Sequence, residues 1–425
     1  MEWQQGGEHH DKITTIVVYD NYDEQYYQWV WFPEFDEDFM NNIENCDKKI
    51  FSSERDMIES FMRTMIVKDP DMLIAWFGLK FDLPKLLDRA CALGLNPLVM
   101  SPYHKIDGVK QLKDSCSFKR QDGYSPIEQP IGGRLTLNLD LAFERQWNDS
   151  QRGMLPSLAL DYVSELVLGT KKLVSEKFPD KNDFFQRGWL EDTQRYLDYA
   201  RVDVELLVQI DDNMNTSESV IALQRLLKAP FEACFYASNM GGIYFMRNAW
   251  WKAPTGVKGE RVNYEGATIY DPSTEGTNGL HLGVAAFDFA QLYPSMMIAR
   301  NISWETKSDV PTEFGVNIKT PKDFSEVKHK DMRYYRTDKL GLLPKAVLEL
   351  KELRSKYKKL MKDSKTTEDI NKWNSNQLAV KRLSASFYGI TAYQGFGWAD
   401  VDLAASITAS AREAIRSAAF KAREL

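Results

Sequence analysis

The sequence predicts a multidomain protein of the α/β and α+β classes, and three observations predict it. Strand patterns alternate with helical patterns up to about residue 215, which is typical of an α/β domain. Residues 250–279 are punctuated by Pro, Gly, Thr and Ser, which indicates loops and short strands. Residues 342–389 carry the apolar spacing of a helix pair. A length of 425 residues leaves room for about three domains of ~150 residues each.

The first region opens with two strands, because the run at 13–31 is apolar on both sides of a polar turn at 21–24. Periodicity then predicts six further elements before the second region. In chain order these are a helix at 53–66, a strand at 72–77, a helix at 83–93, a strand at 134–143 and helical patterns at 188–212 and 216–228.

The second region contains one apolar run, HLGVAAFDF (281–289), which predicts a buried strand. A helix follows at once, since Pro294 suits a first helical turn. The helix pair at 342–389 is expected to end at a C-cap on Gly389. Residues 402–425 form a last helical pattern, which has no stop signal, so the chain is expected to be cut short there.

Composition excludes several classes of protein. With 43% hydrophobic and 27% charged residues the chain is neither collagen-like, mucin-like nor wholly disordered. No apolar stretch reaches the ~18–20 residues of a membrane span, and the first twelve residues have no apolar core of a signal peptide. We therefore expect a cytoplasmic protein, in the host cytoplasm if the source is a phage or virus.

The four cysteines have no CxxC spacing, so the sequence predicts no disulfide framework, no zinc site and a reducing compartment. They are Cys46, Cys91, Cys116 and Cys234.

Charge is unevenly distributed. The net charge of −7 argues weakly against nucleic acid, but residues 345–362 hold seven basic and two acidic residues, a net of +5. A basic segment in an otherwise acidic chain suits a protein that binds phosphate groups at one place only.

A carboxylate and a set of cations follow one another along the chain. Asp288 ends the predicted strand, where it suits either metal binding or capping of the next helix. Four cations recur at helical spacing and therefore share one face of a helix. That face suits either a solvated surface or a phosphate-binding site. The four are Lys351, Arg354, Lys358 and Lys362. Nucleotidyl transfer requires a carboxylate that holds Mg²⁺ and cations at the leaving pyrophosphate.

These segments resemble family B DNA polymerases. The run from Asp288 to Ser295 (DFAQLYPS) looks like the DxxSLYPS motif of that family. The run from Lys381 to Gly389 (KRLSASFYG) is similar to its KxxxNSxYG motif, although Ala385 stands where the family usually has Asn. Residues 264–267 (YEGA) resemble its YxGG turn, and residues 341–344 (GLLP) with Arg354 and Lys358 resemble its first fingers helix.

The resemblance implies roles for the matching residues. Asp288 would be a catalytic metal ligand, and Tyr293 would pack under the incoming sugar and exclude a 2′-hydroxyl. Further nucleotide contacts would come from Arg354, Lys358 and Lys381 at the triphosphate and from Tyr388 at the nascent base pair, and DNA contacts from Tyr264, Gly266 and Gly389.

The first region resembles the RNase H-like 3′–5′ exonuclease of the same family. Asp82 matches its second motif, although Phe77 stands where Asn is usual. Tyr199 and Asp203, which share one helical face at i, i+4, match its third. By themselves the last two also suit a surface helix. The resemblance implies that all three serve the exonuclease, with Asp82 and Asp203 as metal ligands.

Two parts of the family pattern are not found. The first exonuclease motif, Asp-x-Glu, has no match, because Glu2, Glu8 and Asp11 lie on no strand pattern, while Asp20, Asp23 and Glu24 suit a solvated turn. After the fingers there is no Asp-Thr-Asp hairpin and no thumb. Asp400 and Asp402 are interpreted as helix-start charges rather than metal ligands. The two-metal Mg²⁺ site is therefore expected to be incomplete.

The sequence thus predicts four parts: an exonuclease domain lacking its first motif (1–215), a linker and amino-terminal palm segment (216–338), a fingers helix pair (339–390) and a truncated palm re-entry helix (391–425). The predicted function is template-directed dNTP addition on primer-template DNA, inactive without the missing segments, which a second polypeptide would supply. The short fingers suggest a viral or phage replisome. A degenerate polymerase-like subunit that binds DNA or a partner, and a stand-alone RNase H-like nuclease, remain the alternatives.

Overall fold

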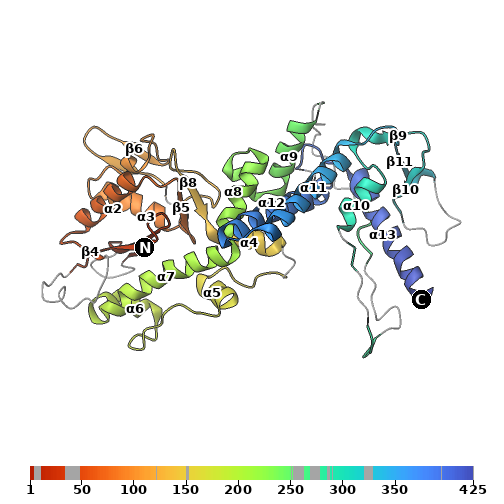
Figure 1. Ribbon diagram of the computed structural model, residues 1–425. Coiled ribbons are helices and arrows are strands. Elements are labelled where there is room, and N and C mark those ends of the chain that lie inside the picture. The colour runs from red at the N-terminus through yellow and green to blue at the C-terminus, as the bar shows by residue number, and fades with distance from the viewer. Residues whose placement is uncertain are drawn as a thin grey trace. The chain divides into compact units, whose positions relative to one another are not determined.

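The computed structural model describes residues 1–3, 11–33, 48–120, 122–149, 153–249, 251, 263–268, 278–284, 288–289, 291–319, 329–393 and 395–424 (Figure 1). The chain forms two compact units, Met1–Ser217 and Glu218–Leu425. Glu8 and Cys46 lie outside the described residues. No helix in the described ranges is both long and apolar enough to cross a bilayer.

The first unit is built on a four-stranded sheet in the order β1 (Glu2–Trp3), β2 (Ile13–Asp20), β3 (Gln25–Val30) and β4 (Lys48–Ile50). The β2–β3 hairpin confirms the predicted strand pair around the turn at 21–24, and Asp20 pairs with Gln25. Two smaller sheets pair β5 (Met72–Ala75) with β8 (Leu135–Asn138) in parallel, and β6 (Val109–Gln111) with β7 (Cys116–Phe118) antiparallel.

The predicted strand at 134–143 is only half right. Its last residue in the sheet is Asn138, which pairs with Ala75, the last residue of β5. Among the described residues no partner strand extends beyond that point, and the chain continues as a helix from Leu139.

The first unit has six helices in its described residues: α2 (Glu54–Lys68), α3 (Asp82–Ala92), α4 (Leu139–Asp149), α5 (Leu160–Leu168), α6 (Lys181–Glu191) and α7 (Thr193–Met214). Helices α2 and α7 pack directly against the hairpin, while α4 packs against β8 and α5 against α7. One core joins Trp29 of β3 to Ile58 and Leu87 of α2 and α3. A second core gathers Val30 with Tyr196 and Phe184 of α7 and α6.

Two long-range contacts fix α7 on the hairpin. The Thr14 and Tyr196 hydroxyls lie 2.8 Å apart, and the Gln28 amide donates to the Leu197 carbonyl oxygen at 3.2 Å. Tyr199 and Asp203 follow on the same helix, so these contacts position them.

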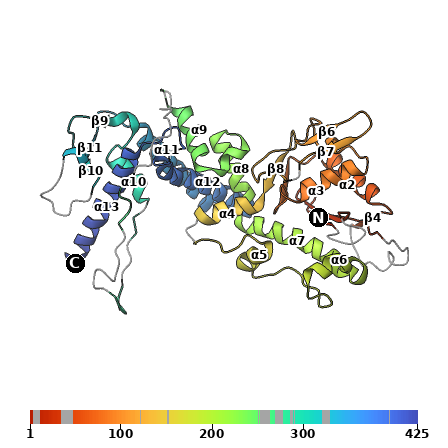
Figure 2. The same ribbon diagram turned by 180° about the vertical axis from the view of Figure 1, so that it is seen from behind.

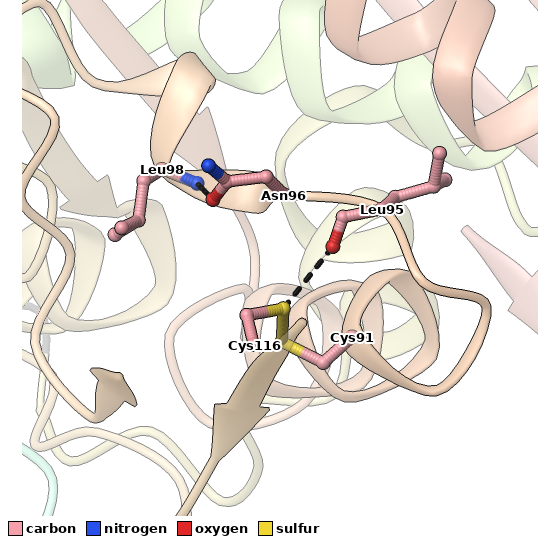
Figure 3. The surroundings of a disulfide bond; sticks show 5 residues. All are labelled: Cys91, Leu95, Asn96, Leu98 and Cys116. Atoms are coloured by element: carbon pink, nitrogen blue, oxygen red, sulfur yellow. Dashed lines mark hydrogen bonds between the residues drawn. A yellow bond between two sulfur atoms is a disulfide. The ribbon is translucent and has the colours of Figure 1, made fainter. Parts of the chain in front are cut away.

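A disulfide joins Cys91 of α3 to Cys116 of β7 (Figure 3). The expectation of no disulfide is therefore wrong for this pair. The two cysteines are 25 residues apart, and only the packing of β7 against α3 brings them together. Cys116 is buried, and its Sγ lies 3.1 Å from the carbonyl oxygen of Leu95.

The second unit is mainly helical. Its helices are α8 (Thr216–Leu227, beginning at the end of the first unit), α9 (Ala237–Asn248), α10 (Leu292–Ala299), α11 (Leu342–Asp363), α12 (Thr367–Thr391) and α13 (Val401–Glu424). A three-stranded antiparallel sheet has the order β10 (Phe314–Asn317), β11 (Met332–Tyr335) and β9 (Lys307–Ser308). Short 3₁₀ turns occur at Pro97–Met100 in the first unit and at Phe231–Phe235, Trp304–Thr306 and His329–Asp331 in the second.

The predicted helix pair is α11 and α12, which run side by side and are joined by residues 364–366 (Figures 1 and 2). Helix α12 begins at an N-cap, Thr366, whose side chain accepts from the Asp369 amide. It continues past Gly389 to Thr391, so the predicted C-cap at Gly389 is wrong.

The predicted buried strand at 281–289 is also wrong for its described residues. Residues 281–284 and 288–289 are not in a strand, and Leu282 and Val284 are 91% and 75% exposed. A strand needs a neighbour to satisfy its backbone groups, and within the described part of the chain none pairs with this segment.

Candidate functional site

Three carboxylates of the first unit form one electrostatic site. Glu2 lies on β1, whose pairing with β2 places it opposite Thr15. Burial raises the pKa of Glu2, the Met1 ammonium opposes this, and the negative charges of Asp203 and Asp82 add to it, which gives a pKa of about 7. Such a carboxylate ionises only at a cost, first because it is buried and then because two other carboxylates share its surroundings.

The amino group of Met1 forms an ion pair with Asp82, with 3.6 Å between its nitrogen and Oδ1. Burial alone would lower the pKa of this amino group. The charges of Asp82, Glu2 and Asp203 outweigh that effect and raise it. The charges of Glu2, Asp82 and Asp203 therefore all act on the Met1 amino group, so the three carboxylates lie near one another.

Asp203 on α7 has one satisfied and one unsatisfied oxygen. Oδ2 accepts from the Lys172 ammonium at 2.5 Å, and the same ammonium lies 3.4 Å from the Tyr199 hydroxyl. Oδ1 is buried and has no hydrogen-bond partner. Burial raises the pKa of Asp203, against the opposing charge of Lys172. The geometry thus brings Tyr199 and Asp203 to a common cation.

Glu2 is the residue that sequence patterning missed. The expectation that it sits on no strand is wrong, because β1 is a two-residue strand, too short for any hydrophobic alternation. Only its acidic character beside Trp3 could have drawn attention to it. Asp11 is elsewhere: it pairs with Lys85 and lies in a left-handed backbone conformation.

The oxygen-only donor set of Glu2, Asp82 and Asp203 fits the chemistry of a hard divalent cation. The unpartnered Asp203 oxygen and the raised pKa of Glu2 both indicate missing positive charge. In the described ranges, however, no three acidic, His or Cys side chains are arranged to hold a metal ion. The three carboxylates therefore have the chemistry of metal ligands, but their described positions do not form a complete coordination sphere.

A cluster of three tyrosines marks the second unit. The rings of Tyr293 on α10 and Tyr388 on α12 stack with centroids 4.2 Å apart and planes at 26°. The Tyr388 hydroxyl lies 3.3 Å from that of Tyr264. Burial raises the pKa of Tyr293 and of Tyr388, so both phenols are neutral near pH 7. Asp288 is exposed and precedes α10 by four residues.

The predicted cations lie on the helix pair without touching one another. The Arg354 Nε donates to Gln377 Oε1 of α12 at 3.2 Å, and burial lowers the pKa of this guanidinium. Lys358 is exposed on α11, and Lys381 is half-buried on α12. Among described residues no hydrogen bond or ion pair joins these three.

The remaining positions are more weakly constrained. A Cβ added at Gly266 or Gly389 would meet nothing within 4 Å, so both glycines border open space. Ala385 is exposed on α12. Phe77 packs edge-on against the ring of Phe81 at 6.3 Å, beside the start of α3.

Asp400 and Asp402 stabilise the start of α13. The Asp400 Oδ1 accepts from the Asp402 and Leu403 amides at 3.1 and 3.3 Å, which confirms the predicted helix-start role. Both carboxylates are also paired, Asp400 with Lys307 at 2.6 Å and Asp402 with Arg333 at 2.9 Å. These pairs occupy the oxygens that a metal would need.

Two family models match long segments of the chain. Residues 217–422 match the model of DNA polymerase family B, and residues 2–127 match that of the DNA polymerase family B exonuclease domain. DNA polymerase 1 of Pyrococcus abyssi is 28% identical over 86% of this chain and 44% of its own length. The DNA polymerase delta catalytic subunit of Plasmodium falciparum is 28% identical over 88% of this chain and 35% of its own.

A solved structure shows the same fold. The family B DNA polymerase from the archaeon Pyrobaculum calidifontis superposes with a TM-score of 0.66 at 20% identity, over 97% of this chain and 48% of that one. The chain therefore spans less than half the length of these relatives. Two family models that together match most of the sequence, in the same order as the two compact units, show that the chain belongs to DNA polymerase family B.

Proposed function

We propose that this chain provides the exonuclease domain (1–215), the first palm segment (216–338), the fingers (339–390) and the palm re-entry helix (391–425) of a DNA-directed DNA polymerase. The reaction is template-directed addition of dNTP to primer-template DNA in replication. The observation that carries the proposal is the stack of Tyr293 on Tyr388, which unites two polymerase motifs 95 residues apart. A cytoplasmic site of action, in a phage- or virus-infected host, suits a replication enzyme.

In the second unit the tyrosine stack forms one wall of the nucleotide site. Tyr293 packs under the sugar and leaves no room for a 2′-hydroxyl, while Tyr388 packs against the nascent base pair. Tyr264 with Gly266 and Gly389 face the DNA, and the open space at both glycines supports close approach of a backbone. Arg354, Lys358 and Lys381 contact the triphosphate, which compensates charge on the leaving pyrophosphate.

Asp288 supplies an exposed carboxylate at the start of α10. It would hold Mg²⁺, which when bound polarises the phosphate and balances the charge that develops on its oxygens. A second carboxylate is needed for two ions. We propose that this carboxylate comes from sequence outside these 425 residues, and that the same sequence supplies the contacts that hold the DNA duplex.

In the first unit Glu2, Asp82, Asp203 and Tyr199 form a 3′–5′ exonuclease site for the primer end. Glu2, Asp82 and Asp203 would hold Mg²⁺ there. Lys172 favours the ionised form of Asp203 through their 2.5 Å ion pair, and so opposes the burial that raises the pKa of this carboxyl. The neutral Tyr199 phenol, 3.4 Å from the same ammonium, is placed to donate a hydrogen bond to a phosphate or water.

A second polypeptide is the proposed source of the missing palm strands and thumb. Leu280, Leu282 and Val284 alternate along one segment and are 91%, 91% and 75% exposed, the pattern of a strand that awaits a partner. The relatives, of which the chain covers less than half, have ample additional sequence to supply that partner.

The test is reconstitution. The chain is mixed with a polypeptide from the neighbouring gene and assayed for primer extension with Mg²⁺. Extension that is lost in Asp288→Ala and kept in Asp309→Ala, an exposed aspartate of the same unit, supports the proposal. Binding of DNA without extension or nucleotide affinity, in every combination, would instead identify a non-enzymatic polymerase-like subunit.

A further inference from the structure

Arg412 is a buried arginine on α13, a helix that packs against α10, α12 and β10. It is 3% exposed, and burial lowers its pKa. A buried guanidinium is costly unless its donors are satisfied. Nη1 donates to the carbonyl oxygens of Glu265 and Gly266, each at 2.6 Å, and Nη2 donates to that of Ile318 at 3.0 Å. The Glu265 carboxylate lies 3.4 Å from Nη2.

Thr408 lies one turn earlier on α13 and reaches the same segment. Its hydroxyl donates to the Glu265 carbonyl oxygen at 2.8 Å, in competition with the Ala405 carbonyl oxygen of its own helix at 3.0 Å. We call Thr408 and Arg412 the α13 clamp. Residues 263–268 belong to no helix or strand, so the clamp takes the place of a backbone ladder in holding this segment.

The clamped segment carries Tyr264, and Tyr264 touches the nucleotide wall. Its hydroxyl is 3.3 Å from that of Tyr388, which in turn stacks on Tyr293 at 4.2 Å. The positive charge of Arg412 also lowers the pKa of Tyr388 and Tyr293, against the larger effect of burial, so the guanidinium is electrostatically close to both phenols. A continuous set of contacts therefore runs from Arg412 to the wall under the sugar.

We infer that Arg412 is a positioning residue for sugar discrimination. By fixing residues 264–266 it holds Tyr264 against Tyr388 and so prevents Tyr388 and Tyr293 from moving apart to admit a 2′-hydroxyl. The inference rests on the proposed function, because it concerns the same nucleotide site. Arg412 itself touches no substrate.

If Arg412 only stabilised α13, its mutation would have a different effect on nucleotide binding. Its loss would weaken binding of dNTP and rNTP by the same factor, since both need a folded second unit. Loss of a positioning residue changes the ratio of the two affinities. The affinity ratio is therefore the deciding measurement.

The experiment measures the Kd of the 425-residue chain for dATP and for ATP, by competition with a fluorescent dATP analogue. The variants are Arg412→Met, Thr408→Val and Thr408→Ser. Arg416→Met is the matched control, because Arg416 is exposed one turn further along the same helix. Amide hydrogen exchange of residues 263–268 is followed in each variant.

We expect Arg412→Met to reduce the preference for dATP about tenfold, which corresponds to about 1.4 kcal/mol, and to speed exchange at residues 263–268. Thr408→Val should act in the same direction by about threefold, whereas Thr408→Ser and Arg416→Met should behave as wild type. An unchanged ratio in Arg412→Met, with wild-type binding intact, overturns the inference alone. A wild-type chain that binds neither nucleotide, both alone and together with the polypeptide from the neighbouring gene, overturns the proposed function, and the inference with it.

Discussion

Single carboxylates determine the character of the proposed exonuclease site, and they were predictable to different degrees. Asp82, Tyr199 and Asp203 were predicted from the resemblance to family motifs, and the structure gives Tyr199 and Asp203 one shared ammonium, Lys172. Neither Lys172 nor Glu2 was predicted. Glu2 lies on a two-residue strand and Lys172 in a loop 31 residues from its partner. Neither position leaves a periodic signal, because each side chain reaches the site only through tertiary packing.

Glu2 should make stability fall as pH rises. Its folded-state pKa of about 7 lies above the ordinary value of 4.5, so between these two pH values the folded state binds a proton that the unfolded state does not. We expect a loss of about 1–3 kcal/mol between pH 4.5 and 7 that is absent in Glu2→Gln. Urea unfolding at pH 5, 6, 7 and 8 measures it.

Glu24→Gln, at an exposed turn position, is the control and should keep the wild-type pH dependence. Asp140, whose pKa burial also raises to about 7, is present in every variant and cancels in the difference. Identical slopes for wild type and Glu2→Gln would place Glu2 in solvent.

Removing the Lys172 ammonium should leave Asp203 buried without its partner. We expect Lys172→Met to lose about 1–3 kcal/mol of unfolding free energy at pH 7, less than the about 3–5 kcal/mol of a fully buried pair, because both side chains keep some exposure, 16% and 22%. The loss should shrink as the pH falls, because burial raises the pKa of Asp203 and the neutral acid has no need of the ammonium. Lys171→Met, which breaks only an exposed pair with Glu165, should cost under about 0.5 kcal/mol.

At the scale of elements, periodicity predicted what is long and regular. The pair α11 and α12 and the hairpin β2–β3 appear where their patterns place them. The predictions that were wrong concern elements whose ends depend on a partner strand elsewhere in the chain. The strand at 134–143 stops where β5 stops, and the segment 281–289 has no partner strand in the described part of the chain. The disulfide between α3 and β7 depends on the same kind of contact.

The helix pair carries a testable prediction about the triphosphate. Lys381→Ala should reduce the affinity of the chain for dNTP by roughly tenfold or more, since a hydrogen bond to a charged group contributes about 1.5–3 kcal/mol. Lys372→Ala, at an exposed position of the same helix, should bind as wild type. Equal affinity of the Lys381 variant and wild type, by equilibrium titration, would remove Lys381 from the triphosphate site.

For the whole molecule, motifs were more informative than composition. The net charge of −7 pointed away from nucleic acid, yet both family models match. Two motif pairs in the right order predicted the family. The geometry of the catalytic centres could not be predicted in this way, because it depends on carboxylates brought together from distant segments.

The isolated chain should not extend a primer at a useful rate with Mg²⁺. Asp288 alone cannot hold two ions that keep most of their water unless several oxygens bind them. A primer-extension assay on the purified chain checks this. Extension that Asp288→Ala abolishes would mean that a further carboxylate had been overlooked, and freeing Asp400 from Lys307 would be the first possibility to examine.

The hold of α7 on the β2–β3 hairpin has a consequence for synthesis on the ribosome. The hydroxyl pair of Thr14 and Tyr196 spans 182 residues. At about 5–20 residues per second the hairpin waits roughly 10–35 seconds for that helix to be translated. Helix α2 is made soon enough to cover the Trp29 side of the sheet, but the side around Val30 stays open to other nascent chains. Chaperones that bind early in translation would therefore recognise the hairpin, and slower codons before residue 193 would lengthen its exposure.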